Sequence, residues 1–156
     1  MDITLAYQEK GRGEPLILLH GNGEDSSYFR HQIAHFQDRY RVIALDTRGH
    51  GKSPRGSAPL TIRQFARDLL DFLEIHGIAD AVLLGFSDGA NIAMRFAMEH
   101  PERVKALILK RRKPGPRRGE AEHAASHRDR LPDRAALRRP LGGGPEKRGD
   151  AGPDGE

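Results

Sequence analysis

Short apolar runs recur along the first 109 residues, and each one is too short for a buried helix. They are rich in branched side chains, which is typical of strands that are covered on both faces of a parallel sheet. The first run is interpreted as an edge strand. We therefore expect strands at residues 2–8, 16–19, 42–45, 81–84 and 104–109.

Helical patterns fill the stretches between these strands. The longest one places its large apolar residues on a single face and stops at Gly77, a residue type that commonly ends helices. A shorter one is expected to be capped near Ser26, and the last to end before Pro101. Helices are thus expected at residues 28–36, 61–76 and 90–99. This alternation predicts the α/β class, with a mostly parallel sheet flanked by helices.

The pentapeptide Gly-Phe-Ser-Asp-Gly at residues 85–89 lies between a predicted strand and a predicted helix. A serine at such a turn is lifted clear of the backbone, and the flanking Gly85 and Gly89 let the strand and helix pass closely. Similar pentapeptides also occur as ordinary turns or helix caps, so the strand-to-helix context matters. In this context Ser87 is the candidate nucleophile.

Two backbone N–H groups are candidates for an oxyanion hole. Asp88 falls at the start of the predicted helix, where N–H groups lack helical partners and favour negative charge. The negative charge of the Asp88 side chain is interpreted only as favourable at a helix N-terminus. Asn22 lies in the loop after the strand at residues 16–19 and is the expected second donor.

Three motifs in this order resemble the α/β-hydrolase family: His-Gly-Asn-Gly at residues 20–23, Asp-Thr-Arg-Gly-His-Gly-Lys-Ser at residues 46–53, and the serine pentapeptide. The resemblance covers residues 1–109, the N-terminal part of such a domain. It implies a Ser-His-acid triad, a small-molecule acyl substrate, and hydrolysis of an ester, thioester, lactone or related acyl bond. It calls for no cofactor.

The histidine and the acid of the triad are not found in a recognisable context. In the resembling family both follow the strand that lies here at residues 104–109. Asp46 and His50 could be imagined as a rearranged triad with Ser87. The resemblance instead implies that residues 46–53 form a structural loop, and that His20 shapes the oxyanion loop.

The composition changes after residue 109. Residues 110–156 contain no Val, Ile, Met, Phe, Tyr or Trp, and carry 13 Lys or Arg against 8 Asp or Glu. We expect a basic Gly/Pro/Arg-rich disordered tail, because so little apolar surface cannot offset the entropy of ordering. Such a composition is also what out-of-frame translation of a GC-rich gene would give, so a truncated or frameshifted hydrolase with little or no activity is expected.

Two alternatives to an active enzyme stay open. The basic tail could bind nucleic acid or another anionic partner, but it has no aromatic residues for base stacking, so nucleic acid is the less favoured partner. A noncatalytic fragment could associate with itself through an uncovered sheet edge.

Other features of the sequence exclude several classes of site. There is no cysteine, which excludes disulfides and thiol catalysis, and no spacing typical of metal ligands. No apolar stretch reaches membrane-spanning length and no secretory signal is evident, so no membrane partner and a cytoplasmic location are expected.

Overall fold

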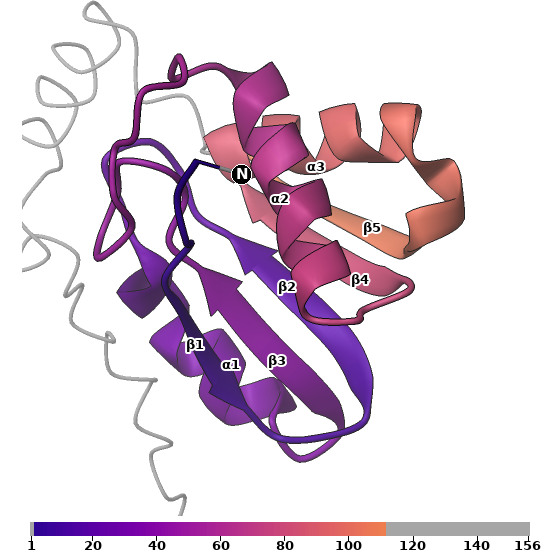
Figure 1. Ribbon diagram of the computed structural model, residues 1–156. Coiled ribbons are helices and arrows are strands. Elements are labelled where there is room, and N and C mark those ends of the chain that lie inside the picture. The colour runs from indigo at the N-terminus through magenta and orange to yellow at the C-terminus, as the bar shows by residue number, and fades with distance from the viewer. Residues whose placement is uncertain (1, 112–156) are drawn as a thin grey trace, which may run out of the picture. The chain divides into compact units, whose positions relative to one another are not determined.

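A computed structural model describes residues 2–111, which form one mixed sheet with helices on both faces (Figure 1). The sheet has the strand order β1-β3-β2-β4-β5. β1 is antiparallel to β3, and every other neighbouring pair is parallel. The predicted α/β fold with a mostly parallel sheet is confirmed. The strands are β1 (Tyr7–Lys10), β2 (Glu14–Leu19), β3 (Tyr40–Leu45), β4 (Ala81–Phe86) and β5 (Val104–Lys110).

Helices connect the parallel strands where helical patterns were expected. α2 begins after Thr61, whose hydroxyl accepts the N–H of Gln64 at 3.1 Å, and it stops just before Gly77, which has a φ of +62°. The helical segments are η1 (Ser26–Phe29), α1 (Arg30–Phe36), α2 (Ile62–Ile75), α3 (Asp88–Glu99) and η2 (Pro101–Arg103).

The N-terminal part departs from the prediction in two details. The first strand was expected from residue 2 but begins at Tyr7, and Asp2 is instead ion-paired with Arg48 on a neighbouring loop. The first helical segment is capped by Asp25, next to the expected Ser26. The Asp25 carboxylate accepts a backbone N–H of the same turn at 2.8 Å.

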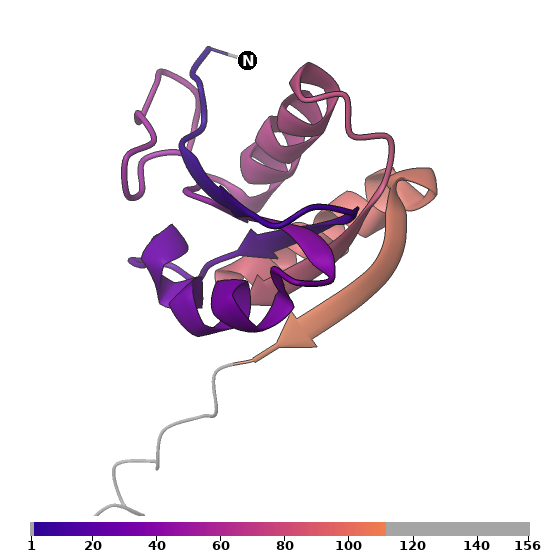
Figure 2. The same ribbon diagram turned by 90° about the horizontal axis from the view of Figure 1, so that it is seen from below.

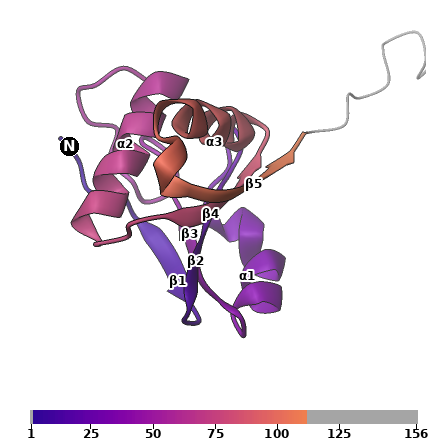
Figure 3. The same ribbon diagram turned by 90° about the vertical axis from the view of Figure 1, so that its right-hand side faces the viewer.

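Two apolar cores lie on opposite faces of the sheet, because successive residues of a strand point to opposite sides. One core contains Ile17 and Ile43 and is covered by α2 and α3. The other contains Leu16 and Val42 and is covered by η1 and α1. Figures 2 and 3 show α2 and α3 on one side of the sheet and α1 on the other.

β5 is the least covered of the parallel strands. It forms an edge of the sheet, and every residue from Lys105 to Lys110 is exposed. By contrast, the last four residues of β2 are fully buried. The apolar run that predicts β5 therefore forms a strand with open surface.

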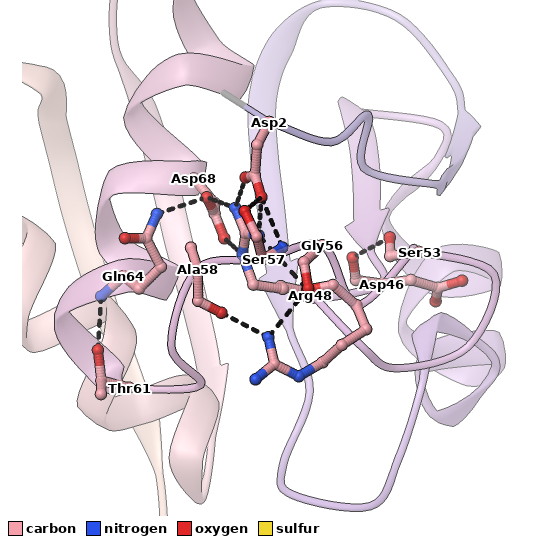
Figure 4. A network of polar contacts seen from close by, with 11 residues as sticks. Asp2, Asp46, Arg48, Ser53, Gly56, Ser57, Ala58, Thr61, Gln64 and Asp68 are labelled. Atoms are coloured by element: carbon pink, nitrogen blue, oxygen red, sulfur yellow. Dashed lines mark hydrogen bonds and ion pairs between the residues drawn. The ribbon is translucent and has the colours of Figure 1, made fainter.

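A buried arginine ties the loop after β3 to α2 and to the N-terminal segment (Figure 4). The fully buried Arg48 guanidinium donates two hydrogen bonds to Asp68 of α2, from Nε at 2.8 Å and from Nη2 at 2.7 Å. It also donates to Asp2 at 2.5 and 3.0 Å. These bonds to Asp68 and Asp2 raise the pKa of Arg48, and the bond from Arg48 lowers the pKa of Asp2. The arginine thus stays charged, and it fixes the loop against α2.

No helix within residues 2–111 is long and apolar enough to cross a membrane. The tail predicted for residues 110–156 lies, from residue 112 onward, outside the described residues. Its predicted disorder and the domain boundary after residue 109 stay predictions.

Breaking the buried ion pair should destabilise the fold far more than breaking an exposed one. Arg48→Met leaves the buried Asp68 carboxylate without its main partner, so the free energy of unfolding in urea should fall by about 3–5 kcal/mol. The matched change Arg41→Met, in the half-exposed pair with Glu9, should cost about 1 kcal/mol or less. Equal losses in the two variants would contradict this account of Arg48.

Candidate active site

The turn between β4 and α3 holds Ser87 in an unusual backbone conformation. Its φ is +53° and its ψ is −114°, and it is the only residue other than glycine with positive φ among those described. Side chains rarely adopt this conformation, and it stores strain of about 1–3 kcal/mol. This is the geometry expected of a serine lifted out of a strand-to-helix turn.

Both glycines of the predicted elbow are required by close backbone approach. A Cβ on Gly89 would lie 1.9 Å from the carbonyl oxygen of Leu19, at the end of β2. A Cβ on Gly85 would lie 2.3 Å from the carbonyl oxygen of Gly89 itself. The first turn of α3 therefore packs directly on β2 and β4, and any larger side chain would push these elements apart.

Some backbone groups of this turn form hydrogen bonds, and one has no acceptor among the described residues. The N–H of Ser87 donates to the carbonyl oxygen of Lys110 in β5 at 2.9 Å, and the Ser87 carbonyl accepts the N–H of Ala90 at 3.0 Å. Asp88 is the first residue of α3, where no helical acceptor is available for its N–H. No other acceptor in residues 2–111 takes that N–H.

The loop after β2 lies beside Ser87. A Cβ on Gly21 would be 3.1 Å from the Cβ of Ser87, so the two residues are nearly in contact. Glu24 closes this loop, because its carboxylate accepts the N–H of Gly21 at 3.0 Å while its own N–H donates to the Gly21 carbonyl at 3.2 Å. The N–H of Asn22 has no acceptor among the described residues. The sequence prediction missed this role of Glu24. A glutamate three residues after Gly21 has the same spacing as the glutamate of a capping box, and that spacing could have indicated it.

The two predicted oxyanion donors line the same cavity, of about 460 Å³. Ser87 is not among the lining residues, but its neighbours Gly21 and Asp88 are. The lining combines polar and apolar residues. The lining residues are His20, Gly21, Asn22, Thr47, Gly49, His50, Leu60, Thr61, Ile62, Phe65, Asp88 and Ile92.

The buried ring of His20 joins the loop after β2 to the loop after β3. Its Nδ1 lies 2.8 Å from the carbonyl oxygen of Gly21, and its Nε2 lies 3.0 Å from the backbone nitrogen of Thr47. A carbonyl oxygen accepts and a backbone N–H donates, so these contacts assign a neutral ring with the proton on Nδ1. Burial lowers the pKa of His20, and the nearby ring of His50 acts in the same direction.

His50 lies in the cavity, but no hydrogen bond in the described part of the chain joins it to Ser87. Its Nδ1 is 3.1 Å from the hydroxyl of Thr47 and 3.1 Å from the carbonyl oxygen of Arg48. Thr47 thus stands between the two histidine rings, a role that nothing in its sequence context indicated.

The carboxylate of Asp46 accepts hydrogen bonds from the backbone of two loops. Its carboxylate accepts the N–H of Ser26 at 2.7 Å and the N–H of Lys52 at 2.9 Å, and a Cβ on Gly51 would collide with it. It makes no hydrogen bond with His50 within residues 2–111. The rearranged triad of Asp46, His50 and Ser87 is therefore not assembled in this structure.

The same region offers no evident metal centre. Within the described residues, no three His, Asp or Glu side chains gather as metal ligands would.

Comparison with known proteins adds to this geometry. The family model for the alpha/beta hydrolase fold matches residues 14–113. The chain belongs to the α/β-hydrolase fold family. The three motifs that carry the resemblance all fall inside the matched residues.

Relatives in this family have different named activities. The chain is 36% identical to 3-oxoadipate enol-lactonase 2 of Acinetobacter baylyi over 110 residues, which cover 69% of this chain and 41% of the lactonase. It is 39% identical to epoxide hydrolase 4 of Mus musculus over 101 residues, 63% of this chain and 28% of that protein. The solved structure of a marine microorganism esterase matches with a TM-score of 0.68 at 30% identity, over 81% of this chain and 48% of the esterase. The chain spans less than half the length of these relatives.

Removing the strain at Ser87 should stabilise the protein. Ser87→Gly should unfold at higher urea than Ser87→Ala, with a free energy of unfolding greater by about 1 kcal/mol, because glycine adopts positive φ freely. The exposed Ser27, whose φ is not positive, is the matched control. At position 27, Ser27→Gly should be less stable than Ser27→Ala. The same order of stabilities at both positions would contradict strain at Ser87.

The ring of His20 should stay neutral under mildly acidic conditions. Its folded pKa lies below the ordinary 6.5, so the unfolded chain binds more protons and the contribution of His20 to stability is lost as the pH falls below about 6.5. An NMR titration of the ring, assigned with His20→Gln, should give a pKa below 6.5 and a proton on Nδ1. A pKa above 6.5, or a proton on Nε2 in the neutral form, would contradict the assigned tautomer.

Proposed function

We propose that this chain carries the nucleophile and the oxyanion-binding groups of a serine hydrolase that acts on an ester or related acyl bond. The observation that carries the proposal is the strained turn of Ser87 beside two N–H groups, of Asn22 and Asp88, that have no acceptor within residues 2–111. Donors of this kind stabilise the negative charge that develops on a carbonyl oxygen.

The proposed reaction begins with attack of the Ser87 hydroxyl on the acyl carbon. The carbonyl oxygen takes up negative charge and accepts hydrogen bonds from the N–H groups of Asn22 and Asp88. The hydroxyl proton passes to a base and from it to the departing alcohol, as the carbonyl re-forms and the bond to the leaving group breaks. Water then attacks the acyl ester on Ser87, which releases the carboxylic acid and restores the hydroxyl. The negative charge on the carbonyl oxygen is the charge that these two N–H groups would stabilise.

The nature of the nucleophile favours acyl substrates over epoxides. A serine hydroxyl forms an acyl ester with a carbonyl substrate. The other nucleophile that such sites use is the carboxylate of an Asp or Glu side chain. The residue at the strained turn is Ser87, while the carboxylate of Asp88 belongs to the first turn of α3. The lactonase and the esterase are therefore better guides to the substrate class than the epoxide hydrolase.

We further propose that turnover by this chain is weak. No histidine ring is hydrogen-bonded to Ser87 in the described residues, so the proton of its hydroxyl has no placed acceptor there. Serine hydrolases that lose a member of the triad keep only the acceleration due to the oxyanion hole and substrate binding. An acyl group placed on Ser87 would then also leave slowly.

Acetylation by p-nitrophenyl acetate tests this proposal. The full chain should accumulate an acetyl group on Ser87 faster than on any other serine, as measured by peptide mass spectrometry. Steady turnover should stay below about 1 s⁻¹, the low end for enzymes. Ser87→Ala should remove the fast acetylation, whereas the exposed-site control Ser57→Ala should keep it.

The two parts of the proposal can fail separately. Acetylation of Ser87 no faster than that of the exposed Ser57 would contradict its role as the nucleophile. Rapid steady turnover that Ser87→Ala abolishes would support the nucleophile and contradict weak activity.

A further inference from the structure

The peptide between Gly21 and Asn22 carries one of the two proposed oxyanion donors, and its carbonyl oxygen is held by two groups. Nδ1 of His20 lies 2.8 Å from that oxygen, and the N–H of Glu24 donates to it at 3.2 Å. The C=O and N–H of a trans peptide point in opposite directions, and no peptide bond among the described residues is cis. The two contacts at the Gly21 carbonyl therefore also set the direction of the Asn22 N–H.

Glu24 holds Gly21 on both sides. Its backbone N–H binds the Gly21 carbonyl and closes a four-residue turn, while its carboxylate oxygen Oε2 accepts the Gly21 N–H at 3.0 Å. The peptides before and after Gly21 are thus both fixed by the same residue. A backbone contact alone would fix only the second of them.

This double contact lies beside the candidate nucleophile. A Cβ on Gly21 would be 3.0 Å from Oε2 of Glu24 and 3.1 Å from the Cβ of Ser87. The carboxylate and the serine therefore approach the same side of Gly21, where the missing side chain leaves room for both.

The sequence of the turn explains why its peptides need to be held. Glycines stand on either side of Asn22, and a residue without a Cβ has access to many backbone conformations. Gly23 has a φ of +75°, and a Cβ built on it would meet nothing within 4 Å, so packing does not restrain it. A half-turn rotation of the peptide between Gly21 and Asn22 would exchange the N–H for a carbonyl oxygen, which repels an oxyanion.

We propose that Glu24 is a positioning residue of the oxyanion hole, which holds Gly21 so that the N–H of Asn22 faces the acyl oxygen of a substrate at Ser87. Glu24 acts through the reach of its hydrogen-bond acceptor, and its charge is not required. The inference rests on the proposed function, because the direction of this N–H matters to catalysis only where a carbonyl oxygen takes up negative charge.

Two substitutions separate reach from charge. Glu24→Gln keeps the length of the side chain and an acceptor oxygen but removes the charge, whereas Glu24→Asp keeps the charge and is one methylene shorter. Glu74→Gln removes the same charge at an exposed position of α2 and is the matched control.

The rate of acetylation of Ser87 by p-nitrophenyl acetate, followed at increasing ester concentration, gives the first measurement. Glu24→Asp should lower the maximal rate by about tenfold or more and leave the half-saturating concentration nearly unchanged, because the oxyanion forms only in the reaction. Glu24→Gln should stay within about threefold of the unchanged chain, since a neutral acceptor still binds the Gly21 N–H. Glu74→Gln should not alter the rate.

Amide hydrogen exchange gives a measurement that does not depend on activity. The Gly21 amide should lose protection in Glu24→Asp and keep it in Glu24→Gln. The amides at the centre of β3 should stay protected in both variants, because the change is local to the turn.

The outcomes distinguish this inference from the proposed function. If Ser87 of the unchanged chain is acetylated no faster than Ser57, the proposed function fails and the role of Glu24 fails with it. If Ser87 is acetylated but Glu24→Asp reacts as fast as the unchanged chain, or Glu24→Gln is the slower of the two variants, only the role of Glu24 is contradicted. A slow Glu24→Asp variant whose Gly21 amide stays protected would contradict it as well.

Discussion

The close packing of α3 on the end of β2 is the constraint on which the candidate site depends. The missing Cβ of Gly89 allows the first turn of the helix to touch the carbonyl of Leu19. The chain passes from β4 into α3 at the single residue Ser87, which has a positive φ. The same contact brings the start of α3 beside the loop that begins at His20. One steric requirement thus strains the serine and gathers the two free N–H groups.

Polar side chains then hold the loops around this packed centre. Asp46 fixes two loops through their backbone N–H groups, His20 bridges the loops after β2 and β3, and Arg48 anchors the second of these loops to α2. Each of these side chains is buried, and each has partners that satisfy its hydrogen-bonding groups. Their loss would leave uncompensated polar atoms inside the protein, so the shape of the cavity is set by groups that do not themselves react.

The sequence predicted features that depend on local pattern and missed those that depend on distant partners. The elbow at residues 85–89 was predictable because its glycines and serine are adjacent and lie between a strand and a helix. The pairing of Arg48 with Asp68 joins residues far apart in the chain, and no local signal reports it. The first strand was placed too early because the apolar pattern of residues 2–6 gives no sign that Asp2 is held by Arg48. Thr47 and the carbonyl of Lys110 were missed for the same reason, since backbone geometry decides their contacts. The exposure of β5 was also hidden, because an apolar run looks alike whether it is covered or open.

The hydrogen bond between the N–H of Ser87 and the carbonyl of Lys110 links the serine to the last residue of the edge strand. Edge strands and their ends open locally at a lower free energy than the centre of a sheet. Each fraying event at the end of β5 therefore releases the amide of Ser87, and the exchange protection of that amide is bounded by the local opening of β5. The amide of the serine is then only as well protected as the edge strand beside it, even though the glycine packing around the turn lies in the buried centre of the fold.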